Sequence, residues 1–200
     1  MTWVTPQLAV GPAPMSVAVL DSIKKQGIKA IMNLCMELGE LAQLEFDQVK
    51  DLLAKTEADV PQEAARCGKH HTECCVGPVR LSLAEAIYLQ FSLNSELGRE
   101  LRQEAISRAL QTGAPDCPIV RDGCCLLYEF RPAACRAFDR PGAETGVPGQ
   151  QAEALQTLSD EILEIFLEAK TKHSAPEFQL SDVVSGKFVQ RFFHLLPNRK

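Results

Sequence analysis

Seven cysteine and histidine side chains within a stretch of 69 residues constrain this chain more than any other feature: Cys67, His71, Cys74, Cys75, Cys117, Cys125 and Cys135. They form the patterns Cys-x3-His-x2-Cys-Cys, Cys-Pro-x6-Cys and Arg-Pro-x2-Cys-Arg. Thiolate and imidazole groups bind zinc and iron well, and close spacing can bring several of them to one point. The sequence therefore predicts a metal site.

The number of candidate ligands leaves the nature of that site open. Cys67 and His71 are four residues apart, and His71 and Cys74 are three apart, so one helical or turn-like segment could present all three. The adjacent Cys74 and Cys75 could serve two ions, or one ion with the second thiol in reserve. Seven candidates exceed the four ligands of one tetrahedral zinc or of one four-cysteine iron–sulfur cluster. Two ions, or one cluster with spare thiols, are both open.

Length and composition exclude several other classes of protein. The chain has 200 residues, of which 46% are hydrophobic, so it can bury a substantial core. Eight cysteines would allow disulfides, but disulfide scaffolds are usually small, secreted and short of core. A net charge of -5 without a Lys/Arg run argues against nucleic-acid binding, and no apolar segment is long enough to span a membrane. The first residues lack a secretory signal, which predicts a cytoplasmic location.

The first 60 residues predict a small β-α-β-α unit. Its expected elements are a strand over 3–10, a helix over 16–26, a strand over 28–34 and a helix over 37–55. Because a helix connects the two strands, we expect them to pair in parallel. Cys35, within the second apolar strand, is expected to be a core residue.

From residue 61 the pattern is mostly helical. Ser82 and Glu85 have the spacing of a capping box at the start of a helix whose Leu83, Ile87 and Phe91 share one face. Further helices are expected over 100–110 and 151–170 and from Phe188 to Leu196, with a loop over 138–150. We therefore expect an α+β protein with a β-α-β-α N-terminal unit (residues 1–60) packed on a mostly helical cysteine-cluster domain (residues 61–200).

The cysteine segment resembles a known family. In the YkgJ-type cysteine-cluster proteins, which are zinc- or iron-chelating domains, the pattern is Cys-x3-Cys-x2-Cys-Cys, then Cys-Pro, a Cys three residues before Tyr, and Arg-Pro-x2-Cys-Arg. The matching positions here are Cys67, Cys74, Cys75, Cys117-Pro118, Cys125 with Tyr128, Arg131-Pro132 and Cys135-Arg136. His71 stands where the family has its second cysteine, an exchange that zinc and iron both accept.

The resemblance covers about residues 62 to 170 and implies that these cysteines and His71 bind zinc or an iron–sulfur cluster. Cys124 occupies a variable position of the family pattern and is expected to be a spare thiol. Arg131 and Arg136 could pair with the negative charge of a thiolate-rich site, or form structural ion pairs.

A second resemblance concerns the N-terminus, where residues 3–38 are similar to the opening strands of dual-specificity phosphatases. These enzymes need a His-Cys-x2-Gly-x2-Arg loop that cradles phosphate while the cysteine attacks as a thiolate. Residues 74–80 fit Cys-x2-Gly-x2-Arg, which would make Cys74 the nucleophile, Arg80 the phosphate clamp and Asp47 or Asp51 the acid. Glu73 replaces the histidine and would raise a thiol pKa, and Pro78 removes an amide donor.

Three functions follow from the sequence. The first is a structural or metal-handling zinc protein, and the second is an iron–sulfur redox or maturation factor. The third is a cysteine phosphatase that uses Cys74 and Arg80. The metal interpretation accounts for more residues, and it leaves the N-terminal unit as a structural piece or as a docking site for a protein client. If the chain is an enzyme, it would be an iron–sulfur oxidoreductase or, as the weaker alternative, a phosphatase.

Overall fold

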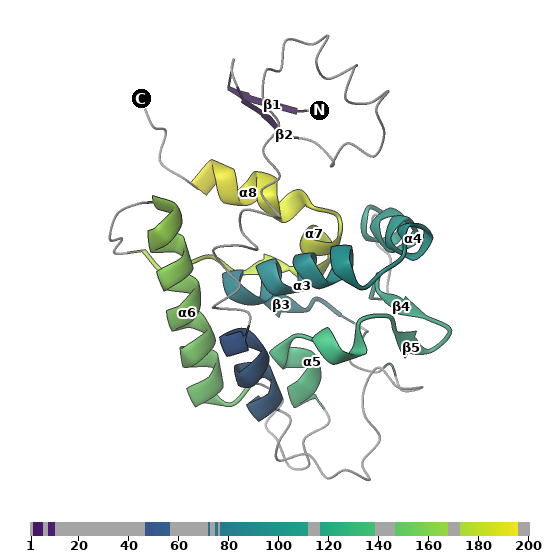
Figure 1. Cartoon of the computed structure of the whole chain (residues 1–200), viewed down its shortest axis with the longest axis horizontal. Helices are drawn as coiled ribbons and strands as arrows, with labels where there is room; N and C mark the ends of the chain where they lie inside the picture. The colour runs from purple at the N-terminus through teal and green to yellow at the C-terminus, as the bar shows by residue number, and fades with distance from the viewer. Residues whose placement is uncertain are drawn as a thin grey trace. The chain divides into compact units, whose positions relative to one another are not determined.

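The computed structural model describes residues 2–5, 8–10, 47–56, 72, 75, 77–111, 117–138, 147–167 and 173–195. The chain forms two compact units, Met1–Leu41 and Ala42–Lys200. Figure 1 shows that helices dominate the described residues, and the described strands are short and antiparallel. The chain is therefore α+β in the broad sense that the sequence predicts.

In the first unit, the described residues form a β-hairpin. Strand β1 (Thr2–Thr5) pairs antiparallel with β2 (Leu8–Val10), and Trp3 lies opposite Ala9. The expectation of one continuous strand over 3–10 is wrong. The chain reverses between Thr5 and Leu8, where the sequence has Pro6, which cannot donate a ladder hydrogen bond. The expected helix over 16–26, the strand over 28–34 and Cys35 lie outside the described residues.

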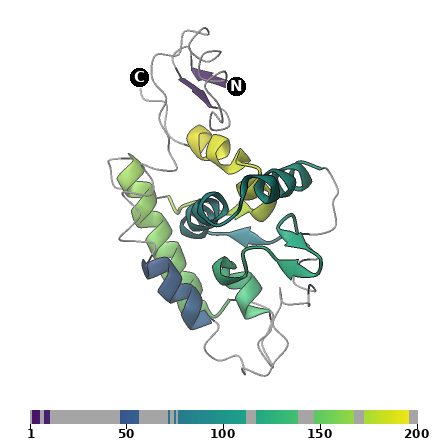
Figure 2. The ribbon, with the colours of Figure 1, turned by 45° about the vertical axis from the view of Figure 1, so that its right-hand side comes forward.

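Helix α3 (Leu83–Ser95) is the centre of the second unit. It packs against α6 (Gly149–Leu167) and α7 (Leu180–Val184), as Figures 1 and 2 show. The predicted capping box at its start is confirmed, since Ser82 and Glu85 exchange side-chain and backbone hydrogen bonds. Leu83 and Ile87 are buried as expected, whereas Phe91 is 40% exposed.

Two further predicted helices are confirmed, but their ends differ from the predicted ones. Helix α4 (Arg99–Ala109) begins after Gly98, and α6 begins at Gly149, inside the segment expected to be a loop. Leu155, Leu158 and Ile162 of α6 are buried, while Ile165 is 47% exposed. The fully buried Ser159 joins α6 to the start of α3, because its hydroxyl accepts from the Ala84 N–H at 3.1 Å and donates to the Leu155 carbonyl at 2.7 Å.

The predicted C-terminal helix is α8 (Lys187–Leu195), which packs on α7. Phe188 and Phe192 are buried, and the ring of Phe188 meets the ring of Phe178 edge to face, with 5.5 Å between centroids. Aromatic pairs of this geometry stabilise a core beyond their buried area. These residues are therefore packing residues, as the sequence suggests.

Residues 47–56 are helical and belong to the second unit, although the sequence placed them in the N-terminal one. Val49, Leu53 and Thr56 are buried. The segment, blue in Figure 1, lies beside α6 in both ribbon views. Its apolar face explains the placement, because a short helix gains most of its stability from tertiary packing.

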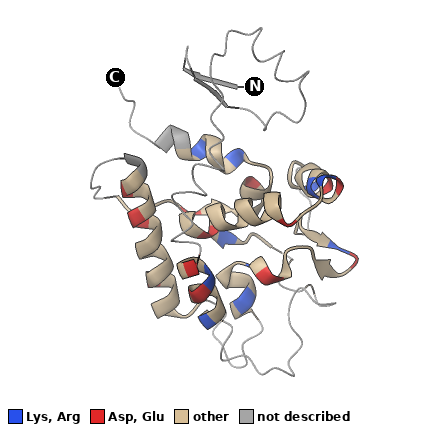
Figure 3. Ribbon diagram, viewed as in Figure 1, with Lys and Arg blue, Asp and Glu red and all other residues tan. Residues whose placement is uncertain are grey.

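Four very short strands complete the described part of the second unit. Strand β3 (Arg80–Leu81) pairs with β6 (Phe178–Gln179), and β4 (Val120–Arg121) pairs with β5 (Cys124–Cys125). Two-residue strands have no detectable period, so the sequence did not predict them. Charged residues of both signs are scattered over the described ribbon (Figure 3). Within the described part of the chain, no helix has the length and apolar character needed to cross a bilayer.

Candidate metal centre

Cys75 and Cys117 link two segments that are distant in sequence. The Cys75 N–H donates to the Thr72 carbonyl at 2.9 Å, and the Cys75 carbonyl accepts from the Cys117 N–H at 3.0 Å. The two thiols are also hydrogen-bonded to each other. Backbone and side chain together therefore hold the first cysteine segment against the Cys117-Pro118 segment.

A tight hairpin carries the next candidate ligand. The turn between β4 and β5 has Asp122 and Gly123 at its centre, with φ of 51° and 75°. Positive φ at both central residues defines a type I′ turn, for which Asp-Gly is a preferred sequence. Val120 lies opposite Cys125 in this hairpin, and the Leu126 N–H donates to the Ile119 carbonyl at 2.9 Å. The short turn brings the strand that carries Cys125 back beside the strand that follows Cys117.

Each of these two cysteines accepts a hydrogen bond at sulfur from the amide two residues further on. The Ile119 N–H donates to the Cys117 sulfur, and the Leu127 N–H donates to the Cys125 sulfur. Both contacts lower the pKa of the thiol that receives them, because an N–H donor stabilises the thiolate. Amide donors of this kind are also the outer-shell contacts that orient and tune thiolate ligands of a metal.

The short helix α5 (Ala133–Ala137) supplies the last candidate, Cys135, which is buried. The Pro132 carbonyl accepts from the Cys135 N–H at 3.0 Å. The helix start is fixed from α3, since the Ala133 N–H donates to Glu85 Oε1 at 2.8 Å. Glu85 is itself buried, and its Oε2 accepts from the Ser82 N–H at 2.9 Å. One carboxylate thus joins the starts of two helices and sets the position of Cys135.

The thiols of Cys75, Cys117, Cys125 and Cys135 influence one another electrostatically. The hydrogen bond with Cys75 raises the pKa of Cys117 far above its ordinary value of 9.0, and burial adds to this rise. Burial raises the pKa of Cys125 to about 11 and that of Cys135 to about 12. The thiols of Cys75 and Cys125 raise it further for Cys135. Without a metal, the raised pKa values keep the thiols of Cys117, Cys125 and Cys135 protonated at neutral pH.

Two arginines of the Arg-Pro-x2-Cys-Arg pattern flank Cys135 in the sequence. Arg131 is 2% exposed, and its charge lowers the pKa of both Cys125 and Cys135. Arg136 donates from Nε to the Arg131 carbonyl at 2.8 Å and from Nη2 to the Glu129 carbonyl. Arg136 therefore clamps the turn η2 (Tyr128–Phe130) onto α5, a structural role that the sequence left open.

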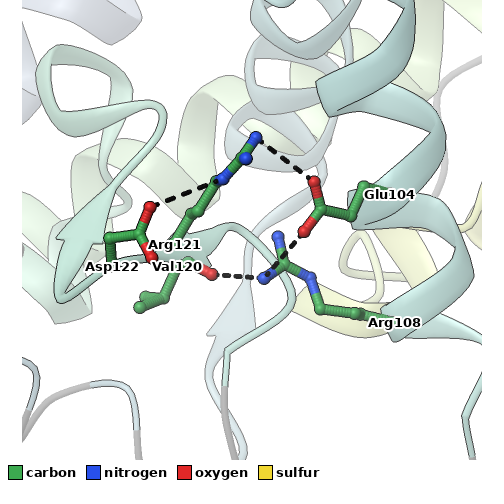
Figure 4. A network of polar contacts seen from close by, with 5 residues as sticks. All are labelled: Glu104, Arg108, Val120, Arg121 and Asp122. Atoms are coloured by element: carbon green, nitrogen blue, oxygen red, sulfur yellow. Dashed lines mark hydrogen bonds and ion pairs between the residues drawn. The ribbon is translucent and has the colours of Figure 1, made fainter.

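Polar contacts outside the cluster hold the hairpin against α4 (Figure 4). Arg108 donates from Nη1 to the Val120 carbonyl, and Arg121 Nη1 lies 3.4 Å from Glu104 Oε2. Arg121 Nε also lies 3.6 Å from Asp122 Oδ2. These side chains are partly exposed, so each ion pair contributes less than about 1 kcal/mol, and their effect is to orient the hairpin.

The remaining expected ligands, Cys67, His71 and Cys74, lie outside the described residues, as does Glu73. The five described cysteines, Cys124 included, are thiols and not disulfides. In the ranges that the structure does describe, no group of three or more His, Cys, Asp or Glu side chains has an arrangement that could hold a metal ion.

In the candidate phosphatase loop, Arg80 forms an ion pair and is not in the position of a phosphate clamp. This residue lies in β3, its guanidinium is 3.7 Å from Glu177, and both side chains are more than half exposed. Asp47 and Asp51 are exposed on the helical segment 47–56. Arg80 therefore contacts a carboxylate on the neighbouring chain segment.

Sequence reasoning missed the long-range role of Glu85 and the two amide donors, Ile119 and Leu127. Glu85 is recognisable as a helix cap, but its bond to Ala133 spans 48 residues and leaves no local signal. Each amide donor belongs to the residue two positions after a cysteine, a spacing typical of a tight knuckle, which the Cys-Pro and Asp-Gly motifs could have indicated.

These features define an α+β protein whose described candidate ligands come from three separate segments, with Cys75 and Cys135 buried and Cys117 and Cys125 partly exposed. No family model matches the chain, and no curated protein and no solved structure is significantly similar to it.

Proposed function

We propose that the chain is a metal-binding protein whose Cys/His cluster holds zinc or an iron–sulfur cluster. The observation that carries the proposal is the backbone hydrogen bond from the Cys117 N–H to the Cys75 carbonyl at 3.0 Å, which joins two distant cysteine segments of the pattern. Cys67, His71 and Cys74 complete the proposed ligand set, and their number allows a second ion. Cys124 is left as a spare thiol, since neighbouring strand residues project to opposite faces and Cys125 is the one that interacts with Cys75 and Cys135.

The donor set fits such a group. Zinc and iron–sulfur clusters both bind thiolates, and each metal–thiolate bond replaces a proton on sulfur. When bound, a zinc ion would crosslink the cysteine segments, whereas an iron–sulfur cluster would add electron transfer. In this proposal the second unit carries the metal. The first unit provides structure or docks a protein client. The proposed location is cytoplasmic, without nucleic-acid partners.

Cysteine replacement tests the proposed ligands. We expect Cys117→Ser and Cys135→Ser each to weaken zinc binding more than about 100-fold, beyond the effect of an outer-shell change. The matched control is Cys124→Ser, in the same hairpin as Cys125, which should bind zinc as the wild type does. Full metal content in either ligand variant would show that the ligand set is wrong.

The cysteine phosphatase stays the alternative function, although no described contact favours it. It requires metal-independent hydrolysis of an aryl phosphate that Cys74→Ser abolishes. The ion pair of Arg80 with Glu177 would have to break before Arg80 could bind phosphate.

A further inference from the structure

The backbones of Cys75 and Cys117 are joined directly, although the two residues are distant in sequence. The Cys117 N–H donates to the Cys75 carbonyl at 3.0 Å. In antiparallel strands, backbone bonds of this kind hold paired Cα atoms about 5.5 Å apart, and disulfides most often have a Cα separation of about 5.5–6 Å. The two backbones therefore approach as closely as a disulfide requires.

Further backbone bonds fix both sides of this contact. The Cys75 N–H donates to the Thr72 carbonyl at 2.9 Å, and the Cys117 carbonyl accepts from the Val120 N–H at 3.1 Å. Both side chains are thiols and not disulfides, and they are hydrogen-bonded to each other. Closing an S–S bond of about 2.05 Å between them therefore needs rotation of the side chains and no new approach of the backbones.

The two thiols differ in exposure, which sets the order in which they can react. Cys75 is 8% exposed, whereas Cys117 is partly exposed, so a small disulfide such as oxidised glutathione reaches Cys117 first. The Cys117 sulfur attacks this disulfide and releases one glutathione, and the Cys75 sulfur then attacks the mixed disulfide at Cys117 and releases the second. Two electrons and two protons thus pass from the pair to the oxidant, which leaves as two thiols.

We propose that Cys75 and Cys117 are a reversible dithiol–disulfide pair that closes when a small-molecule disulfide oxidises the chain. In a reducing compartment, disulfides are usually transient and sense the redox state. The new bond would close a covalent loop that contains β3, α3 and α4. Closure of the pair does not depend on a metal. Its consequence rests on the proposed metal function, because a disulfide removes two of the proposed ligands and should release the metal.

Peptide mapping of the full-length protein tests the pair. The protein as purified is equilibrated with reduced and oxidised glutathione at about 1 mM each, quenched with acid, alkylated and digested with trypsin. We expect more than about half of the molecules to link peptide 70–80 to peptide 109–121, because the effective concentration of a preorganised pair exceeds about 1 mM. Excess dithiothreitol should restore both thiols.

Peptide 70–80 also contains Cys74, which provides the matched control. Cys74→Ser should keep the link, whereas Cys75→Ser and Cys117→Ser should abolish it. In urea the same link should fall to a minor product, because eight cysteines then compete for partners. The proposal is overturned if the wild type or Cys74→Ser lacks the link, if Cys75→Ser retains it, or if urea leaves its yield unchanged.

Metal content before and after oxidation separates this pair from the metal function. A link in a protein that binds neither zinc nor iron would refute the metal function and leave the pair standing. A metal-bound protein that forms no link would refute the pair alone. Full metal content in the linked protein would refute the release of metal on oxidation.

Discussion

Replacing Glu85 by alanine should destabilise the second unit more than any exposed substitution. The Glu85 carboxylate accepts from the Ala133 N–H at 2.8 Å, from the Ser82 N–H at 2.9 Å and from the Ser82 hydroxyl at 2.8 Å. A buried amide left without an acceptor costs about 1–3 kcal/mol. Two such amides give an expected loss of about 4 kcal/mol in the free energy of unfolding, a large part of the stability of an ordinary domain.

Urea unfolding followed by far-UV circular dichroism measures this loss in the full chain. The matched control is Glu153→Ala, which removes an exposed carboxylate from α6 and should change the free energy of unfolding by less than about 0.5 kcal/mol. Glu85→Gln keeps one acceptor oxygen but points an amide donor at another donor, so its loss should be intermediate. Equal stability of Glu85→Ala and Glu153→Ala would refute the reasoning that one carboxylate joins α3 to α5.

Three further predictions follow from the hairpin, the thiols and the surface. Gly123→Ala should cost about 1 kcal/mol or more because its φ is +75°, whereas Gly149→Ala, at a helix start with open space around it, should be neutral or stabilising in the same unfolding assay. In chelator, the contribution of Cys125 and Cys135 to stability should be fully present below pH 9 and be lost as the pH rises through about 11 and 12, because the folded state holds their protons more tightly than the unfolded chain; flat unfolding midpoints from pH 9 to 12 would contradict the raised pKa values. Glu104→Gln should lower the free energy of unfolding by less than about 1 kcal/mol, and by still less in high salt. It should leave zinc affinity unchanged, and a large loss of affinity would mean that the α4 contacts position the ligands.

The elements that the sequence predicted well are those with local signals. The capping box needs only Ser82 and Glu85, and α6 shows its period in Leu155, Leu158 and Ile162. The 3–10 strand failed because alternation of side chains continues through the turn of a hairpin, and only Pro6 marks the break. Strands β3 and β6 pair residues almost a hundred positions apart, which no local pattern can indicate.

The candidate site divides in the same way. Ligand spacing singled out Cys75, Cys117, Cys125 and Cys135, and the structure joins the first two through a hydrogen bond from the Cys117 N–H to the Cys75 carbonyl. The supporting groups could not be predicted from spacing. Burial of Arg131 and the bond from Ala133 to Glu85 depend on how α3, η2 and α5 pack, and that packing is a property of the whole core.

The most direct test of the metal function is anaerobic purification of the full chain, followed by metal analysis and a visible spectrum. We expect at least one equivalent of zinc in a colourless protein, or iron and sulfide in a brown one with charge-transfer absorbance. A protein that carries neither zinc nor iron under these conditions, and takes up neither when they are supplied, would contradict the proposal that the thiol cluster is a metal centre.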